Sequence, residues 1–198
     1  PTLLPELEAT GYTLSLYRAA PAPLVEALAA VHTHRPARPH PAARWREIQV
    51  DAGRSIVSRP PGVRIDSGGV GKGLAADMVA EIWRGTLLPG TAFVVDCGGD
   101  LHFGRAADGR AYDVAVDIPF VGAGDLSLSI TGGGVATSGI GRRIWRRDGG
   151  SYAHHLLDPF SGEPAWTGVV SVTAIGTSSP RMASVSRTPG PVIERQIG

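Results

Sequence analysis

The stretch DSGGVGKGLAAD, at Asp66–Asp77, places several glycines and one lysine directly before a segment with helical periodicity. Glycines let backbone amides approach an anion closely, the N-terminus of a helix attracts negative charge, and a lysine adds a mobile cation. The stretch is not a Walker loop, because Gly73 stands where that loop carries a magnesium-binding serine or threonine. It predicts a phosphate-binding turn. The alternative is a tight strand-to-helix turn whose glycines only satisfy backbone geometry.

Two further glycine clusters carry groups that could contact the same kind of ligand. VVDCGGDLHFG contains Gly98, Gly99 and Asp100 after an apolar run, and a bulge or hairpin turn is the structural alternative there. GGGVATSG offers the hydroxyls of Thr137 and Ser138 beside further glycine amides. Hydroxyls in such a position bind anions or close a local turn. We expect the separate turns to converge on one pocket for linked phosphates.

The stretch YAHHLLDPFSGEP supplies a candidate proton acceptor. His155 lies three residues before Asp158, which begins an Asp-Pro turn. A carboxylate close to an imidazole can set its tautomer and basicity for removing a proton from an attacking hydroxyl. The alternative is a histidine that packs in the fold or faces water.

Composition restricts the classes of protein that these motifs can serve. The 198 residues are 42% hydrophobic and 19% charged, with a formal net charge of +1, which is typical of one globular domain. No long run of basic residues favours nucleic acid, and no apolar run is long enough for a membrane span. Cys97 is the only cysteine, which excludes an internal disulfide.

Periodicity predicts the elements that hold the motifs. Helical spacing covers residues 3–9 and 23–32, and a hairpin is predicted on either side of Asp51–Arg54. A helix follows the glycine loop and should end near Gly85; its expected apolar face comprises Leu74, Ala75, Met78, Val79 and Ile82. Strands are predicted at residues 91–96, 111–118, 125–131, 134–139 and 169–176. Early helices and later strands without βαβ alternation indicate an α+β fold.

Together the four motifs resemble those of the ApbE-like family of FAD:protein FMN transferases. DSGGVGKGLAAD, DCGGD (Asp96–Asp100), ATSG (Ala136–Gly139) and HHLLDPFSG (His154–Gly162) are similar to DLGGIAKGYAVD, NLGGD, ATSG and HHIIDPRTG of that family, in the same order. The opening PTLLPELEATGY also looks like the family's start of this region. The resemblance covers residues 1 to about 180, which we expect to form an ApbE-like (T-fold-like) domain of helices and antiparallel sheet.

The resemblance implies transfer of FMN from FAD to a threonine or serine hydroxyl of a target flavoprotein, with release of AMP and a requirement for Mg²⁺. His155 is then the expected general base, and the carbonyl of Gly71 an expected magnesium ligand. The residues that it assigns to FAD binding are Asp66, Gly68, Gly69, Gly71, Lys72, Gly73, Gly98, Gly99, Asp100, Thr137, Ser138, Gly139 and Asp158. Lys72 would offset the charge of the pyrophosphate, and Asp158 would orient His155 or contact flavin.

Two departures from the family pattern bear on activity. The family carries an additional N-terminal segment before the point at which this sequence starts. The family also continues with a helix whose aspartate and threonine ligate magnesium, whereas Ala183 and Arg187 stand at those positions here. We expect residues 181–198 to form a divergent, irregular tail. The alternatives are a catalytically impaired FAD-binding module, a hydrolase of the FAD pyrophosphate, or a structural domain that binds no ligand.

Overall fold

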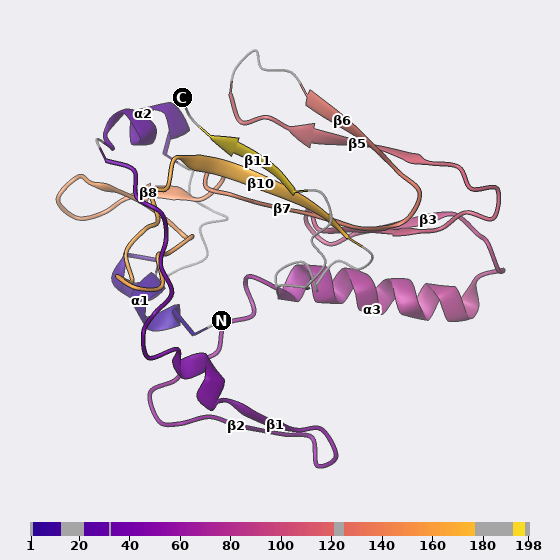
Figure 1. Cartoon of the computed structure of the whole chain (residues 1–198), viewed down its shortest axis with the longest axis horizontal. Helices are drawn as coiled ribbons and strands as arrows, with labels where there is room; N and C mark the ends of the chain where they lie inside the picture. Colours follow the sequence, from indigo (N-terminus) through magenta and orange to yellow (C-terminus); the bar gives the residue numbers. More distant parts are fainter. Residues whose placement is uncertain (1, 13–21, 32, 121–124, 177–191, 197–198) are drawn as a thin grey trace. The chain divides into compact units, whose positions relative to one another are not determined.

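The computed structural model describes residues 2–12, 22–31, 33–120, 125–176 and 192–196 (Figure 1). The chain divides into two compact units. Unit 1 comprises Pro1–Ser67 and Ile140–Val169, and unit 2 comprises Gly68–Gly139 and Val170–Gly198. The domain expected over residues 1–180 therefore contains parts of two units, and unit 2 continues past residue 180.

Unit 1 combines short helices with two small hairpins. Its described elements are α1 (Leu4–Ala9), α2 (Leu24–Ala29), a 3₁₀ helix (Arg44–Glu47), β1 (Gln49–Asp51), β2 (Ile56–Ser58), β8 (Ile144–Arg146) and β9 (Tyr152–His154). The predicted hairpin is confirmed, since β1 pairs antiparallel with β2 and Val50 lies opposite Val57. The α1 end is anchored by Trp145, whose Nε1 donates to the carbonyl of Thr10 at 2.8 Å.

Unit 2 is built on one sheet. Its described elements are α3 (Gly71–Thr86), β3 (Phe93–Asp96), β4 (Leu101–Gly104), β5 (Tyr112–Asp117), β6 (Asp125–Ile130), β7 (Gly133–Gly139), β10 (Val169–Gly176) and β11 (Val192–Gln196). Among the described residues, five strands form the sheet in the order β11-β10-β7-β4-β3, and β5 pairs with β6 as a separate hairpin. The mixed helix and antiparallel-strand architecture confirms the expected α+β fold.

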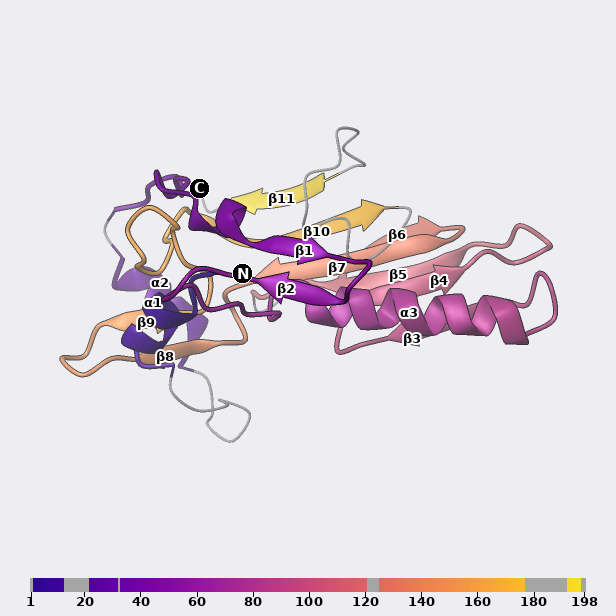
Figure 2. The same cartoon turned by 90° about the horizontal axis from the view of Figure 1, so that it is seen from below.

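The sheet of unit 2 is covered on both faces (Figures 1 and 2). On one face the β5–β6 hairpin packs over the sheet, where Phe103 and Val135 meet Val114 and Ile130 in an apolar cluster. On the other face α3 packs against β3, with its Ala76 and Ala80 in contact with Val95. Alternate residues along each strand therefore face different partners.

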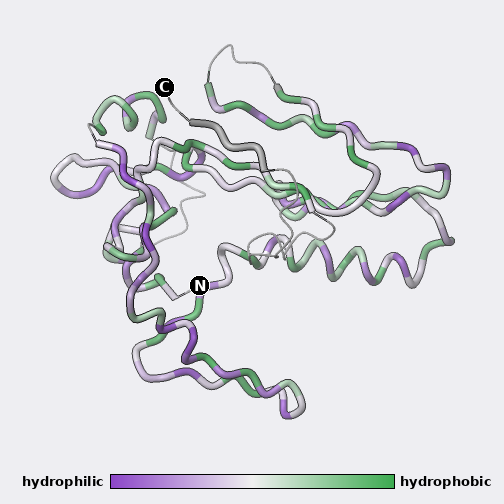
Figure 3. Tube along the Cα trace, viewed as in Figure 1, coloured by the Kyte–Doolittle hydropathy of each residue, from purple (hydrophilic) through white to green (hydrophobic). Residues whose placement is uncertain are grey.

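The buried face of α3 differs from the predicted one. Gly73, Ala76 and Ala80 are its buried residues, whereas the side chains of three residues expected to be buried, Leu74, Met78 and Ile82, are 48%, 57% and 61% exposed. Figure 3 shows hydrophobic and hydrophilic segments alternating along this helix. Small residues let the helix backbone lie close to the hairpin, so the face that packs is the small one rather than the most apolar one.

The predicted irregular tail contains a strand. Val192–Gln196 form β11, which lies next to β10 in the sheet. Two β-branched residues at its start, Val192 and Ile193, favour extended backbone. None of the helices described is both long and apolar enough to span a membrane.

Candidate functional site

The glycine-rich stretch forms the N-terminus of α3. The helix begins at Gly71 after Val70, has no side chain capping its first turn and carries no acidic residue there. The first amides of an α-helix have no intrahelical partner, so the N–H groups of Gly71, Lys72 and Gly73 remain available to a ligand. Together with the helix dipole, they form a local environment that favours an anion.

The two ends of the glycine stretch belong to different units. Gly68 and Gly69 are exposed in unit 2, directly before the helix, and a Cβ at Gly69 would meet no atom within 4 Å. Asp66 is half-buried and belongs to unit 1. The proposed role of Asp66 in ligand binding stays a prediction.

Lys72 connects the glycine helix to the second glycine cluster. Its Nζ donates to the carbonyl of Gly98 and to Oδ1 of Asp100, each at 3.0 Å. The side chain of Lys72 is 43% exposed and that of Asp100 14% exposed. The ammonium thus has a carboxylate partner within the protein. To offset the charge of a bound anion, it must either contact the anion and Asp100 together or break its contact with Asp100.

The cluster at Asp96–Asp100 is the hairpin turn between β3 and β4. Gly98 and Gly99 both have left-handed backbone, with φ of +68° and +91°. The N–H of Gly99 donates to Oδ1 of Asp96 at 2.8 Å, and the N–H of Cys97 donates to the carbonyl of Asp100 at 3.0 Å. Both glycines are thus needed for the turn itself, which agrees with the hairpin turn given above as the alternative to ligand binding.

The third motif forms the end of β7, and its two hydroxyl residues point in opposite directions. Thr137 lies opposite Thr173 of β10, and their hydroxyls are 2.9 Å apart. Thr137 shares its face with Val135 and so with the β5–β6 hairpin, whereas Ser138 shares its face with Gly134, opposite His102, on the side of α3. Of the two predicted residues, Ser138 is the one on the face of the glycine helix.

Strand register brings the second and third motifs to the same end of the sheet. β4 begins at Leu101, which lies opposite Val135, so β7 continues beyond the start of β4 through Ala136–Gly139. The turn at Asp96–Asp100 precedes Leu101 at this end. Gly139 is required for close packing here, because a Cβ would lie 3.0 Å from Cβ of Ser171 and 3.1 Å from the carbonyl oxygen of Val170.

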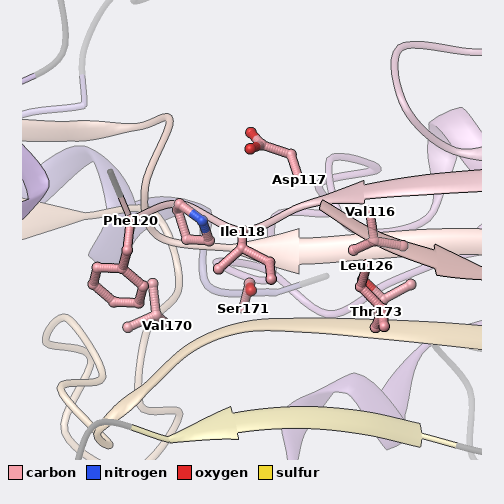
Figure 4. A pocket seen from close by; sticks show the side chains of 9 residues that line it. Val116, Asp117, Ile118, Phe120, Leu126, Val170, Ser171 and Thr173 are labelled. Atoms are coloured by element: carbon pink, nitrogen blue, oxygen red, sulfur yellow. The ribbon is translucent and has the colours of Figure 1, made fainter. Parts of the chain in front are cut away.

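A pocket lies on the opposite face of the sheet, beneath the β5–β6 hairpin (Figure 4). Its empty space is about 370 Å³, including the part open to solvent. In Figure 4 Ile118 lies over Ser171 and Phe120 beside Val170, while the carboxylate of Asp117 points away from both pairs. Because this lining is largely apolar and offers no cation, the pocket does not suit a pyrophosphate.

In unit 1 the histidine pair follows the end of β9. His154 is fully buried; its Nδ1 accepts a hydrogen bond from the N–H of Leu156 at 3.3 Å, and its ring lies edge-on to that of Trp166. Burial, reinforced by the neighbouring His155, lowers the pKa of His154 to about 4. His154 is therefore a neutral, structural imidazole at neutral pH. His155, the expected base, is half-buried.

The carboxylate of Asp158 organises the turn that follows. Its Oδ1 accepts from the N–H of Arg38 at 2.7 Å and from the N–H of Phe160 at 3.2 Å, and its Oδ2 accepts from the hydroxyl of Ser161 at 2.9 Å. The hydrogen bond from Arg38 is the largest cause that lowers the pKa of Asp158 below its usual value. These contacts give Asp158 a role in loop structure, and its expected roles toward His155 or flavin stay predictions.

The described residues do not fit a magnesium site. Within the part of the chain that the structure describes, no three His, Cys, Asp or Glu side chains come together to hold a metal ion. Gly71 is the first residue of α3, where helix geometry engages the carbonyl and leaves the N–H without an intrahelical partner. Ala183 and Arg187, at the other two expected ligand positions, lie outside the described residues. The helix end thus favours an anion over a cation.

Sequence reasoning missed one polar cluster near this site. His102 of β4 is 2% exposed and contacts Asp77 and Arg84, both on α3. The available signal was the position of His102 in the stretch VVDCGGDLHFG, two residues after Asp100. Asp77, the last residue of the glycine motif, lies outside the apolar face predicted for this helix.

The comparisons with known proteins agree with this architecture. The ApbE family model matches residues 12–188, and the chain belongs to the ApbE family. A curated FAD:protein FMN transferase from Klebsiella pneumoniae (strain 342) is 34% identical over 128 residues, covering 63% of this chain and 38% of that protein. Another, from Treponema pallidum (strain Nichols), is 31% identical over 144 residues, covering 67% and 39%.

Two solved structures show the same fold. The ApbE protein from Thermotoga maritima MSB8 matches with a TM-score of 0.68 and 29% identity, over 92% of this chain and 56% of that chain. The apo form of the flavinyl transferase ApbE from Pseudomonas stutzeri matches with a TM-score of 0.55 and 27% identity, over 70% and 42%. The chain spans 38% and 39% of the two curated relatives above.

Proposed function

We propose that this chain binds FAD at the N-terminus of α3 and transfers FMN to a threonine or serine hydroxyl of a target flavoprotein. The observation that supports this proposal most directly is the uncapped start of α3 beside Lys72 and the Gly98–Asp100 turn. Helix amides and a lysine recognise the linked phosphates of a dinucleotide by charge and by hydrogen bonding. The names of the relatives, FAD:protein FMN transferase, support FAD as this dinucleotide.

The proposed reaction is an in-line displacement at the phosphorus of the FMN half. The acceptor hydroxyl oxygen forms a bond to that phosphorus, the bond to the bridging oxygen breaks, and AMP leaves with the bridging oxygen. The proton of the hydroxyl passes to His155, the general base in this proposal. The helix amides would stabilise the negative charge that develops on the phosphate oxygens.

The second candidate is an FAD-binding module that transfers FMN poorly. The identities of Ala183 and Arg187 favour it, because neither side chain offers an oxygen ligand to magnesium. Magnesium belongs to the reaction through the family resemblance, and in the transferases it would act as a Lewis acid at the pyrophosphate. The same helix end and lysine would still bind FAD in this case.

One assay separates the candidates. The chain is incubated with FAD, with and without MgCl₂, and with a peptide that carries the acceptor threonine of a flavinylated protein. Mass spectrometry then reports the peptide adduct and chromatography reports AMP. A covalent FMN adduct with equal AMP supports transfer, FAD binding without products supports the module, and FMN with AMP in the absence of peptide supports hydrolysis. Failure to bind FAD overturns the proposal.

The variant His155→Gln tests the base. It should retain FAD affinity within about twofold, since the proposal places the imidazole on the acceptor side, and it should reduce transfer by 10²-fold or more, about the contribution of a general base. The matched control is His154→Asn, which alters the neighbouring buried imidazole while leaving His155 in place. Undiminished transfer by His155→Gln would show that another group accepts the proton.

A further inference from the structure

His102 connects the sheet of unit 2 to helix α3 through both of its ring nitrogens. Nδ1 lies 2.6 Å from Oδ1 of Asp77, and Nε2 lies within hydrogen-bonding distance of a guanidinium nitrogen of Arg84. The side chain of His102 is 3% exposed and that of Asp77 18% exposed. Asp77 and Arg84 lie seven positions apart on α3, about two helical turns, so the imidazole spans this length of the helix.

The chemistry of the two partners fixes the position of the proton. A guanidinium has only N–H donors, so Nε2 of His102 must accept and cannot carry a proton. The neutral ring therefore carries its proton on Nδ1, which donates to the carboxylate of Asp77. A doubly protonated ring would place two donors face to face at Arg84. The contacts thus select the neutral Nδ1–H tautomer.

This bridge is close along the chain to the contact made by Lys72. Asp100 ends the hairpin turn two residues before His102 of β4, and α3 contacts them through Lys72 and Asp77. The apolar part of the interface places Ala76 and Ala80 against Val95, and nearer the end of the helix Trp83 lies edge-on to Phe93. Small side chains interlock weakly, so in the first half of α3 the directional polar contacts contribute most to how the helix is rotated on the hairpin.

We infer that His102 is a positioning residue: in its Nδ1–H tautomer it fixes α3 on β4 and thereby orients the amides of Gly71–Gly73 and the ammonium of Lys72 toward an anionic ligand. This inference rests on the proposed function only for the identity of the ligand, FAD. The tautomer and its dependence on Asp77 and Arg84 are properties of the free protein.

The first test is the tautomer itself. The full chain labelled with ¹⁵N-histidine is examined by long-range ¹H–¹⁵N NMR at pH 7.5, with His102→Gln used to assign the resonance. We expect a protonated Nδ1 and an unprotonated Nε2 for His102. Asp77→Leu combined with Arg84→Met removes the acceptor at Nδ1 and the donor at Nε2 and should shift the ring toward the other tautomer, with Glu81→Gln on the same helix as a control that leaves it unchanged. A protonated Nε2 in the unmodified chain overturns the inference.

The second test measures FAD affinity by quenching of flavin fluorescence. His102→Phe keeps an aromatic ring and loses both contacts, and we expect its Kd for FAD to rise about tenfold. His102→Gln keeps one donor and one acceptor and should recover most of the affinity. Val114→Ala, in the cluster under the β5–β6 hairpin, is the control for general loss of stability and should bind FAD as the unmodified chain does.

Amide resonances locate the effect. In His102→Phe the N–H signals of Gly71–Gly73 should shift, while those of the β5–β6 hairpin should not. If His102→Phe does not fold, Arg84→Met replaces it, because Arg84 is exposed and its loss removes the Nε2 contact alone. Unchanged amide signals with unchanged Kd in a folded variant overturn the inference. If the unmodified chain binds no FAD, the proposed function fails, and the tautomer and amide shifts still decide the role of His102.

Discussion

The ammonium of Lys72 lies 3.0 Å from the carboxylate of Asp100 and 3.0 Å from the carbonyl oxygen of Gly98. The lysine of the first glycine motif thus closes the turn formed by the second. Two stretches about thirty residues apart in sequence become parts of one structure through a single side chain. The same contact gives Lys72 two roles, one in holding the turn and one, by our proposal, in binding phosphate.

The first prediction concerns the strength of this pair. A double-mutant cycle of Lys72→Met and Asp100→Asn should give a coupling energy of about 0.5–1 kcal/mol, because the ammonium of Lys72 is partly exposed and water screens the pair. Urea unfolding of the four proteins measures it. Coupling within error of zero would show that the turn holds without the ion pair. Arg110→Gln with Asp108→Asn, an exposed pair at 3.9 Å, is the matched control and should show weaker coupling.

The second prediction separates glycines needed by the fold from glycines needed by the ligand. Gly69 has open space where a Cβ would lie, so Gly69→Ala should change the free energy of unfolding by less than about 0.5 kcal/mol. Gly139→Ala should cost about 1–3 kcal/mol, because its Cβ would press on Ser171 and on the backbone of Val170. Chemical denaturation compares the two variants.

The Gly69→Ala variant also reports on the proposed site. If FAD approaches the backbone at Gly69, the added methyl group should weaken FAD binding severalfold while the fold stays intact. Equal FAD affinity in Gly69→Ala and in the unmodified chain would place the ligand away from this residue. Gly85→Ala, at the exposed end of α3 and free of nearby atoms, is the control and should leave FAD binding unchanged.

The third prediction follows from the opposite directions of Thr137 and Ser138. Thr137→Val removes the partner of the buried hydroxyl of Thr173 and should destabilise the fold by about 1–3 kcal/mol, with little change in FAD affinity. Ser138→Ala should leave stability within about 0.5 kcal/mol and weaken FAD binding. Thermal unfolding and fluorescence titration of both variants check this. If Thr137→Val weakened FAD binding and Ser138→Ala did not, the ligand would lie on the sheet face that the β5–β6 hairpin covers.

Local elements of the fold could be predicted because their signals are local. The glycine-to-helix transition at Gly71 and the hairpin at Gln49–Ser58 follow from turn residues and periodicity, and the structure confirms both. The pairing of β7 with β4 and β10 could not be read in the same way. That pairing depends on contacts between distant segments, and β4 has only four residues, too few for an alternating pattern to stand out.

The buried face of α3 shows why an apolar period alone can mislead. Leu74, Met78 and Ile82 have the correct spacing for a core face, yet the helix packs through Gly73, Ala76 and Ala80. Close approach to β3 and β4 favours small side chains, and the polar contact with His102 favours the face that carries Asp77. His102 lies within the quoted stretch VVDCGGDLHFG, yet its role could not be read from the sequence, because its partners Asp77 and Arg84 lie on a helix about twenty residues earlier.

The fourth prediction concerns acid stability and rests on His154. The pKa of this buried imidazole is lowered from 6.5 to about 4 in the folded protein. Between these pH values the unfolded chain binds more protons than the folded one at this position, so stability falls as the pH is lowered from about 6.5 toward about 4. The loss attributable to His154 should reach about 2 kcal/mol at pH 5. Asp158, whose pKa is lowered, adds its own loss only below the ordinary pKa of a carboxyl, about 4.

Urea unfolding at pH 7.5 and pH 5 tests this assignment. His154→Phe keeps a ring beside Trp166 and does not titrate, so its free energy of unfolding should change with pH by about 2 kcal/mol less than that of the unmodified chain. His34→Phe, an exposed histidine of the same unit, is the control and should retain the full pH dependence. Because His154 is neutral above pH 6.5, the stabilities of His154→Phe and the unmodified chain should run parallel there. An unchanged slope in His154→Phe would assign the acid sensitivity to another group.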